Sequence, residues 1–181
     1  MTIESKIFEE AGLKIEKDRV LTYSELICPL NCKYCFAGDL NFNHKKDVAY
    51  LSERQLELMK RLPNEINLIM LGCDTEFLQH KARAIQILEN LSNLGCDISV
   101  VTKLSISSNY LEKLSEIADK IKAKGNLFSL SISVPCTYSS PKWETGVPSP
   151  EKRIKTLEES FKLGIKTLVA LRPLLPTVTN E

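Results

Sequence analysis

Short runs of apolar and β-branched residues alternate along the chain with longer segments in which apolar residues recur every three or four positions. The short runs predict five strands, at residues 20–27, 66–71, 98–102, 127–134 and 167–171. The longer segments predict four helices, at residues 51–62, 78–94, 110–124 and 150–163. Strands that alternate with helices in this way are typical of βαβ units with a parallel sheet, so we expect an α/β fold in the form of a partial (β/α) TIM-like barrel with outer helices.

The fifth predicted strand lies close to residue 181, so the predicted sheet is an open arc. An arc of this kind leaves an edge strand and an apolar inner surface uncovered. A chain of 181 residues can bury one sizeable core, and no flexible linker divides it. We therefore expect one domain over residues 1–181 that lacks the last β/α unit of a barrel. The one long stretch without periodicity, residues 135–149, contains the single tryptophan, Trp143, and is expected to be an irregular loop.

The chain carries 24 basic and 23 acidic residues, a formal charge of +1, so no strong overall field draws it to nucleic acid or anionic lipid. No apolar run approaches the roughly 20 residues that cross a bilayer, and the N-terminus lacks the apolar core of a signal peptide. We expect a cytoplasmic protein with no membrane partner. Thiols stay reduced in that compartment, so the six cysteines indicate metal ligation or catalysis before disulfides.

Three cysteines lie within eight residues: Cys28, Cys32 and Cys35 form a C-x3-C-x2-C motif directly after the first predicted strand. A loop with this spacing can place three thiolates around one [4Fe–4S] cluster, which leaves the fourth iron without a protein ligand and open to a small molecule. The main alternative is zinc, because the same cysteines and His44 could form a Cys3His tetrahedron. A set of unligated thiols is the third interpretation.

The motif, with aromatic residues at Tyr34 and Phe36, resembles the signature of the radical S-adenosylmethionine (radical SAM) superfamily. This resemblance implies a [4Fe–4S] cluster and S-adenosylmethionine as cofactors, and an electron donor such as flavodoxin or ferredoxin. It also implies that reductive cleavage of S-adenosylmethionine gives a 5′-deoxyadenosyl radical, which abstracts a hydrogen atom from substrate.

Polar residues follow the predicted strands at the end where (β/α) barrels collect their active sites. The groups are Gly72-Cys73-Asp74-Thr75-Glu76 after the second strand, Lys103 after the third, Ser131, Ser133 and Cys136 on or after the fourth, and Arg172 after the fifth. They offer carboxylate, ammonium, hydroxyl and guanidinium groups of the kind that hold a zwitterionic ligand with a ribose.

Four segments in order resemble one branch of the superfamily, the spore photoproduct lyases and DNA repair photolyase-like proteins: residues 100–103, 129–133, 143–154 and 169–176. By this resemblance, Lys103 and Ser131 contact the methionine part of the cofactor, the backbone at Tyr34 meets the adenine, and Thr75 places a hydroxyl near the cofactor. The acid that binds the cofactor's amino group would be Asp74 or Glu76. Either acid equally suits the first turn of a helix, where the helix dipole favours it without any ligand.

Cys73 stands at the position where that branch has a cysteine that returns a hydrogen atom to the product radical. A thiol suits this role because it can stay partly buried and uncharged, although a packing role is common for a free cysteine. The branch makes a lyase-like reaction on DNA conceivable, but the short, mixed basic groups of the chain do not support nucleic acid binding. We expect a radical SAM enzyme of unknown substrate. The rivals are a non-catalytic metal-binding or electron-transfer module and an inactive barrel fragment.

Overall fold

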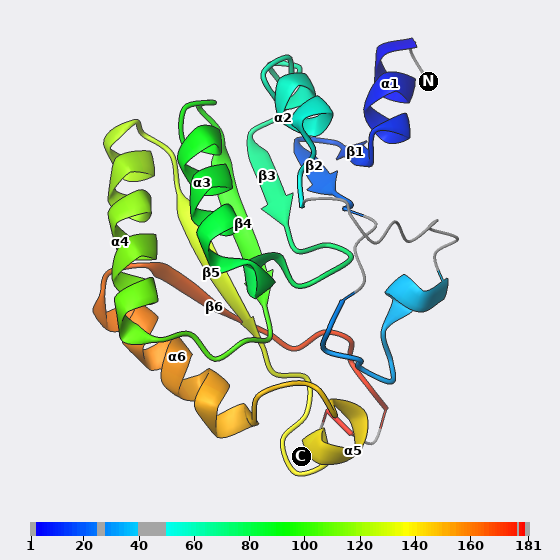
Figure 1. Cartoon of the computed structure of the whole chain (residues 1–181), viewed down its shortest axis with the longest axis vertical. Helices are drawn as coiled ribbons and strands as arrows, with labels where there is room; N and C mark the ends of the chain where they lie inside the picture. The colour runs from blue at the N-terminus through cyan, green and yellow to red at the C-terminus, as the bar shows by residue number, and fades with distance from the viewer. Residues whose placement is uncertain (1–2, 25–27, 40–49, 177, 180–181) are drawn as a thin grey trace.

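The computed structural model describes residues 3–24, 28–39, 50–176 and 178–179. Its centre is one six-stranded sheet in the order β1-β2-β3-β4-β5-β6 (Figure 1). The strands are β1 (Leu13–Glu16), β2 (Arg19–Thr22), β3 (Leu68–Leu71), β4 (Asp97–Thr102), β5 (Phe128–Ser133) and β6 (Lys166–Ala170). The helices are α1 (Ile3–Glu10), α2 (Glu53–Met59), α3 (Lys81–Leu91), α4 (Ser108–Ala123), α5 (Ser140–Trp143) and α6 (Pro150–Lys162), with short 3-10 helices η1 (Phe36–Asp39) and η2 (Phe77–Gln79).

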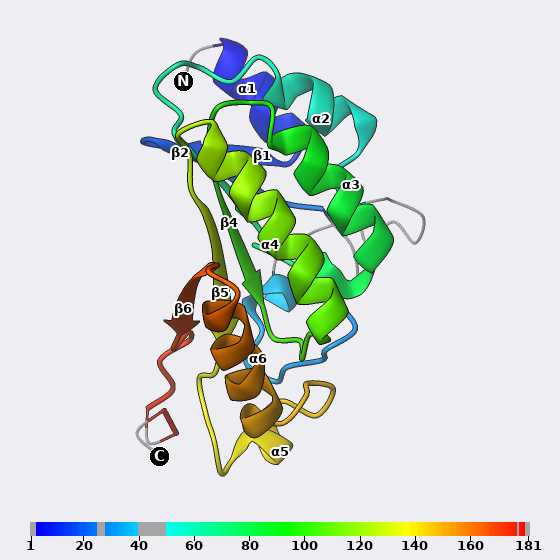
Figure 2. The ribbon, with the colours of Figure 1, turned by 90° about the vertical axis from the view of Figure 1, so that its left-hand side faces the viewer.

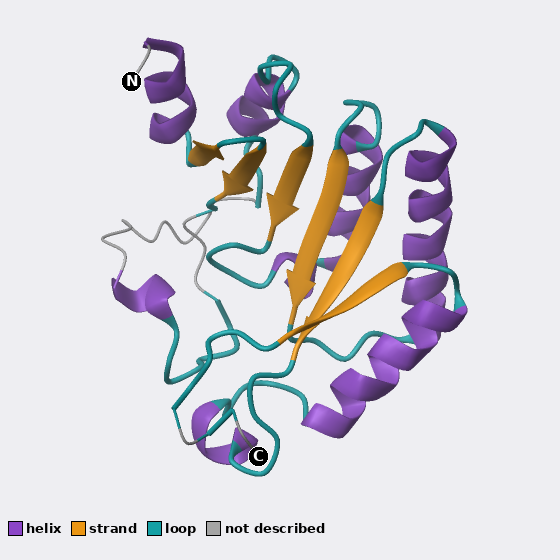
Figure 3. Cartoon of the chain, turned by 180° about the vertical axis from the view of Figure 1, so that it is seen from behind, coloured by secondary structure: helices purple, strands orange, loops and turns teal. Residues whose placement is uncertain are grey.

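The strands β2 to β6 are parallel, and β1 pairs with β2 in an antiparallel hairpin. In Figure 2 the helices α3, α4 and α6 stand on one side of this sheet, as the outer helices of a (β/α) barrel do. Figure 3 shows that β6 lies at the edge of the sheet, which does not close on itself. The predicted fold class, a partial and open (β/α) barrel, is therefore confirmed.

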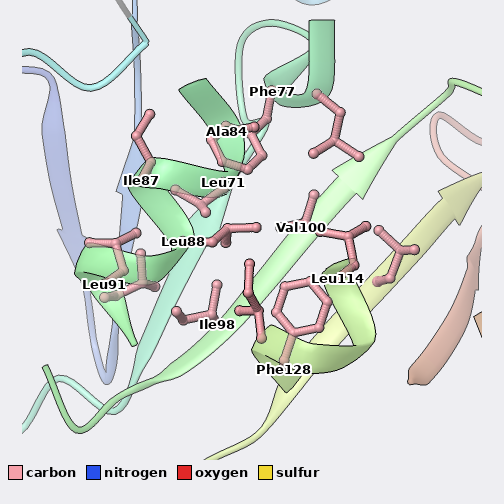
Figure 4. Packing of buried hydrophobic residues seen from close by; sticks show 14 of the residues in the cluster. Leu71, Phe77, Ala84, Ile87, Leu88, Leu91, Ile98, Val100, Leu114 and Phe128 are labelled. Carbon is pink, nitrogen blue, oxygen red and sulfur yellow. The ribbon is translucent and has the colours of Figure 1, made fainter. Parts of the chain in front are cut away.

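The core lies between the sheet and the outer helices, because alternate residues of each strand face the apolar stripe of a helix. On β4, Ile98 and Val100 are almost fully buried while their neighbours are only partly so. They pack with Leu88 of α3, Leu114 of α4 and Phe128 of β5 (Figure 4). Each such side chain contributes about 1.5–3 kcal/mol on burial, so this layer fixes the carboxyl ends of the strands relative to one another.

The opposite face of β5 is polar. Ser129, Ser131 and Ser133 alternate along the strand with residues of the core, and Ser129 pairs with Ser99 of β4. The open arc led us to expect an apolar inner surface, which is wrong for this strand. On the next strand, Leu168 lies opposite Ser131 and is 44% exposed, so the uncovered apolar groups gather toward the β6 edge.

The four predicted helices and the last four predicted strands are present within a few residues of their expected bounds. The first predicted strand, residues 20–27, is wrong in length where the structure describes it, because β2 ends at Thr22 and residues 25–27 lie outside the described residues. The elements α1 and β1 were not predicted, and α5 lies in the stretch expected to be irregular. None of the helices within the described residues is long and apolar enough to cross a bilayer.

Candidate functional site

Residues 28–35, here called the cysteine loop, dock against the segment that follows α5. The Lys33 N–H donates to the Trp143 carbonyl at 2.9 Å, and the Gly146 N–H donates to the Leu30 carbonyl at 3.2 Å. Cys32 and Glu144 form an isolated antiparallel bridge between these contacts. A methyl group at position 146 would lie 2.6 Å from the Leu30 carbonyl oxygen, so only glycine permits this approach.

The three cysteines of the loop fit an iron–sulfur cluster in the chemistry and number of their donors. Cys28 and Cys32 are half-buried, Cys35 is exposed, and burial raises the pKa of Cys32 to about 11. Within the described part of the chain, no group of three histidine, cysteine, aspartate or glutamate side chains is placed to hold a metal ion. The alternative zinc ligand His44 lies outside the described residues. A cubane takes each thiolate on a separate iron, so its binding would order this loop around it.

The carboxylate of Glu144 is the centre of a buried polar cluster beside the cysteine loop, and its side chain is 0% exposed. Oε1 accepts a hydrogen bond from the Tyr34 hydroxyl and lies 3.2 Å from Lys103 Nζ. Oε2 accepts from the Arg153 guanidinium at 2.6 Å and from Ser140 Oγ at 3.1 Å. Burial alone would raise the pKa of Glu144, but the Tyr34 hydrogen bond and the two cations outweigh it and lower that pKa below its ordinary value.

Lys103 is fixed at both of its ends. Its Nζ donates to Ser133 Oγ at 2.6 Å and lies 5.3 Å from the centroid of the Tyr34 ring, and its backbone N–H donates to Glu76 Oε2 at 2.9 Å. The side chain is 17% exposed. The structure thus brings two residues predicted from the sequence, Lys103 and Tyr34, together at the carboxyl end of β4. The charge of Lys103 also acts on the Cys32 thiol, where it opposes the effect of burial on the pKa.

The carboxylate of Glu76, which follows β3, is hydrogen-bonded to Thr102 and Lys103 at the end of β4. Its Oε1 accepts from Thr102 Oγ1 at 2.8 Å and from the Leu78 N–H at 3.1 Å, so it caps η2. Burial raises the pKa of Glu76 despite these bonds. The other candidate acid, Asp74, accepts from the Ser24 N–H at 2.8 Å. Glu76 therefore takes the helix-start position that the sequence left as one of its two interpretations, and its contact with a cofactor stays a prediction.

The neighbours of these acids are uncharged, with Thr75 buried and Cys73 partly buried. Thr75 Oγ1 is buried and has no hydrogen-bond partner among the described residues, an arrangement that costs about 1–3 kcal/mol unless a ligand satisfies it. Cys73 Sγ lies 3.5 Å from the Met70 carbonyl, and burial raises the pKa of Cys73 to about 11. Ser131 is buried on the inner face of β5. Arg172 is exposed, and its carbonyl accepts from Ser133 Oγ at 3.4 Å.

Sequence reasoning gave no role to Glu144 or Arg153. Charged residues are almost never fully buried unless they are paired, so neither was taken as an interior residue. One signal was readable: Arg153 falls at helical spacing with Thr156 and Ser160, and all three lie on the buried face of α6. A charge on the inward stripe of a helix requires a buried partner.

Two surface hollows lie away from this cluster. One, of about 490 Å³, is lined by Thr137 and Pro150 at the start of α6. The other, of about 520 Å³, is lined by Lys81 and Tyr110 between α3 and α4. Neither is lined by a residue of the cysteine loop or by a residue of the Glu144 cluster.

Comparison with known proteins places this site in a wider group. The family model described as "Radical SAM superfamily" matches residues 26–181. A probable dual-specificity RNA methyltransferase RlmN from Prochlorococcus marinus (strain NATL1A) is 25% identical over 137 residues, which cover 74% of this chain and 38% of that protein. The matching protein of strain NATL2A is 25% identical over 142 residues, with the same coverage.

Among solved structures, a point mutant of spore photoproduct lyase is similar with a TM-score of 0.59 and 17% identity over 81% of this chain and 43% of that chain. Spore photoproduct lyase complexed with dinucleoside spore photoproduct gives a TM-score of 0.58 and 16% identity over 83% and 44%. At these identities the likeness shows the fold. The chain spans less than half the length of each of these proteins.

Proposed function

The chain belongs to the radical SAM superfamily, and we propose that it is an enzyme whose Cys28, Cys32 and Cys35 hold a [4Fe–4S] cluster that cleaves S-adenosylmethionine. The observation that carries this proposal is the position of the cysteine loop. The loop carries three thiols, the donors that such a cluster requires, and one of them, Cys32, feels the charge of Lys103, a partly buried, hydrogen-bonded lysine at the carboxyl ends of parallel strands. That end is where (β/α) barrels bind their substrates.

Bound and reduced, the cluster would supply one electron to the sulfonium, giving methionine and a 5′-deoxyadenosyl radical that takes a hydrogen atom from substrate. The chain's own residues would bind and orient S-adenosylmethionine. The ammonium of Lys103 is held by Ser133 and Glu144 and suits a carboxylate. The unpartnered Thr75 hydroxyl and Ser131 on the inner face of β5 suit polar groups of the same ligand.

Further contacts to the cofactor are proposed at Asp74, at the backbone of Tyr34 and at Arg172. Glu76 is the candidate with the least support. The Glu76 carboxylate accepts from Thr102 Oγ1 and from the backbone N–H groups of Lys103 and Leu78, which are all groups of the protein. If Glu76 does not bind the cofactor's amino group, the acid that binds it is Asp74, which is buried beside Ser24. The two acids can be separated by the effect of an amide substitution on the affinity for S-adenosylmethionine.

We propose a lyase-like reaction as the finer assignment, with Cys73 as the hydrogen-atom donor. The support is that the Cys73 thiol keeps its proton, because burial raises its pKa to about 11. It lies next to Asp74 and Thr75, so it borders the proposed cofactor site. This finer proposal includes a nucleic acid substrate and an electron donor such as flavodoxin or ferredoxin. The formal charge of +1 gives nucleic acid binding no independent support.

Anaerobic reconstitution with iron and sulfide tests the function. The wild-type chain should gain a broad absorbance near about 400 nm from iron–sulfur charge transfer and, with dithionite and S-adenosylmethionine, release 5′-deoxyadenosine. Cys32→Ala should lose both signals. Cys96→Ala is the matched control, because Cys96 Sγ is buried 3.4 Å from the Ile66 carbonyl at the opposite end of β3. Iron without cleavage would indicate an electron-transfer module, and zinc without iron would contradict the proposal.

A further inference from the structure

The carboxylate of Glu144 joins three parts of the chain that are distant in sequence. Tyr34 reaches it from the cysteine loop, Lys103 from the end of β4, and Arg153 from α6. Arg153 is fully buried and also donates to the Ser133 carbonyl at 2.5 Å, so it holds the carboxylate against the end of β5. These contacts fix the position of the carboxylate in the described structure, and the Tyr34 hydroxyl of the cysteine loop donates to it.

The cysteine loop has little apolar burial of its own. Leu30 is buried, whereas Asn31, Lys33 and Cys35 are exposed. Segments with few buried apolar groups open at low free-energy cost, so polar contacts decide whether such a loop stays docked. Besides the two backbone hydrogen bonds to residues 143 and 146, the loop has a side-chain hydrogen bond to a buried charge, from the Tyr34 hydroxyl to Glu144. A hydrogen bond to a charged group is among the stronger ones in proteins.

We propose that Glu144 is a positioning residue that docks the cysteine loop onto the ends of β4 and β5 through the Tyr34 hydroxyl, with Arg153 holding the carboxylate from the other side. The purpose of this docking rests on the proposed function, since it would present the thiols beside Lys103. The docking itself is a property of the chain without any cluster. Glu144 is not assigned a contact with cofactor or substrate.

Hydrogen exchange followed by mass spectrometry tests the proposal on the cluster-free chain. Tyr34→Phe removes the hydroxyl but keeps the ring over Lys103 and the buried Glu144–Arg153 pair. It should speed exchange of the backbone amides of residues 30–35 by about tenfold, because a bond to a charged group stabilises the docked state by at least that factor. Glu144→Gln should have an equal or larger effect. Tyr138→Phe is the matched control, since Tyr138 is 88% exposed, and the amides of α4 serve as the internal reference.

Faster exchange in the cysteine loop of both variants, with α4 unchanged, would support the docking role. Tyr34→Phe decides the matter if Glu144→Gln loosens the whole chain by leaving Arg153 buried without its partner. Exchange of residues 30–35 in Tyr34→Phe at the wild-type rate would overturn the proposal. Its failure is distinct from that of the proposed function: the exchange result stands or falls without iron, whereas the function stands or falls on cluster uptake and cleavage by the wild-type chain.

Discussion

The buried pair of Glu144 and Arg153 predicts a strong energetic coupling. Both side chains are 0% exposed, and the guanidinium donates to Oε2 at 2.6 Å. Removing one partner of a buried pair costs about 3–5 kcal/mol, because the other charge is left in the interior. Arg153→Met should lie near the lower limit, since Glu144 keeps Lys103 at 3.2 Å and the Tyr34 hydroxyl. Glu144→Gln should lie near the upper limit, since Arg153 keeps only neutral acceptors, the Ser133 carbonyl and Ser140 Oγ.

The double variant carrying both substitutions removes both fully buried charges, and the partly exposed Lys103 keeps its hydrogen bond to Ser133 Oγ. Its free energy of unfolding should therefore be no lower than that of the less stable single variant, Glu144→Gln. The coupling energy between the two positions is then about 3 kcal/mol or more. The assay is urea unfolding of the metal-free chain, followed by far-ultraviolet circular dichroism and by the fluorescence of Trp143, the single tryptophan and the residue next to Glu144. Arg153→Lys tests the geometry, because an ammonium cannot reproduce the forked contacts to Glu144 and Ser133.

The matched control is a more exposed pair on the same helix, Lys155 and Glu159, whose side chains are 74% and 29% exposed and whose charged atoms lie 3.7 Å apart. Lys155→Met should leave the unfolding midpoint unchanged within error, because exposed pairs contribute little. The reasoning would be refuted if the losses of the two single variants at positions 144 and 153 added up in the double variant. It would equally be refuted if Arg153→Met cost no more than Lys155→Met.

Three further outcomes follow from the site. With a pKa of about 11, Cys73 is ionised in about one molecule in a thousand at pH 8, so iodoacetamide should label exposed Cys35 of the metal-free chain long before Cys73; rapid labelling of Cys73 by mass spectrometry would contradict its burial. Folding raises the pKa of Glu76, so the free energy of unfolding should fall as the pH rises above about 4.5 toward the folded pKa, at about 1.4 kcal/mol per pH unit. In urea titrations at several pH values, Glu76→Gln should remove this slope. If the wild-type chain and the variant showed the same pH dependence, the pKa of this carboxyl would not be raised. Gly146→Ala should lower the thermal midpoint and speed tryptic cleavage after Lys33, since the added carbon meets the Leu30 carbonyl at 2.6 Å; unchanged values of both would mean that the loop does not depend on this approach.

The sequence predicted the layered part of the fold well because that part depends on local periodicity. The alternation of Ile98 and Val100 with partly exposed neighbours, and the spacing of Leu111 and Leu114 on α4, are direct consequences of strand and helix geometry. The elements α1, β1 and α5 were missed because each is short, with four to eight residues, and its pattern is too brief to distinguish from a loop.

The candidate site was predictable only where a motif or a strand end marked it. The spacing of the three cysteines and the position of Lys103 after a strand pointed to the carboxyl end of the sheet, which is where Lys103 and Tyr34 lie together. The residue that joins them, Glu144, sits in a stretch without periodicity and pairs with Arg153 through tertiary structure alone. Ser131 and Ser133 of β5 were predicted as polar groups of the site, but the extension of the polar face to Ser129 was not, because an alternation of serine with Leu130 and Ile132 does not reveal what the serines face.

We propose that the three cysteines hold a [4Fe–4S] cluster with one iron open to S-adenosylmethionine. The electron paramagnetic resonance spectrum of the reconstituted, dithionite-reduced chain, recorded with and without S-adenosylmethionine, tests it most directly. We predict the signal of a reduced cluster whose shape changes when S-adenosylmethionine is added, because the ligand binds the open iron. A cluster signal that S-adenosylmethionine leaves unchanged, or no cluster signal at full iron loading, would contradict the account.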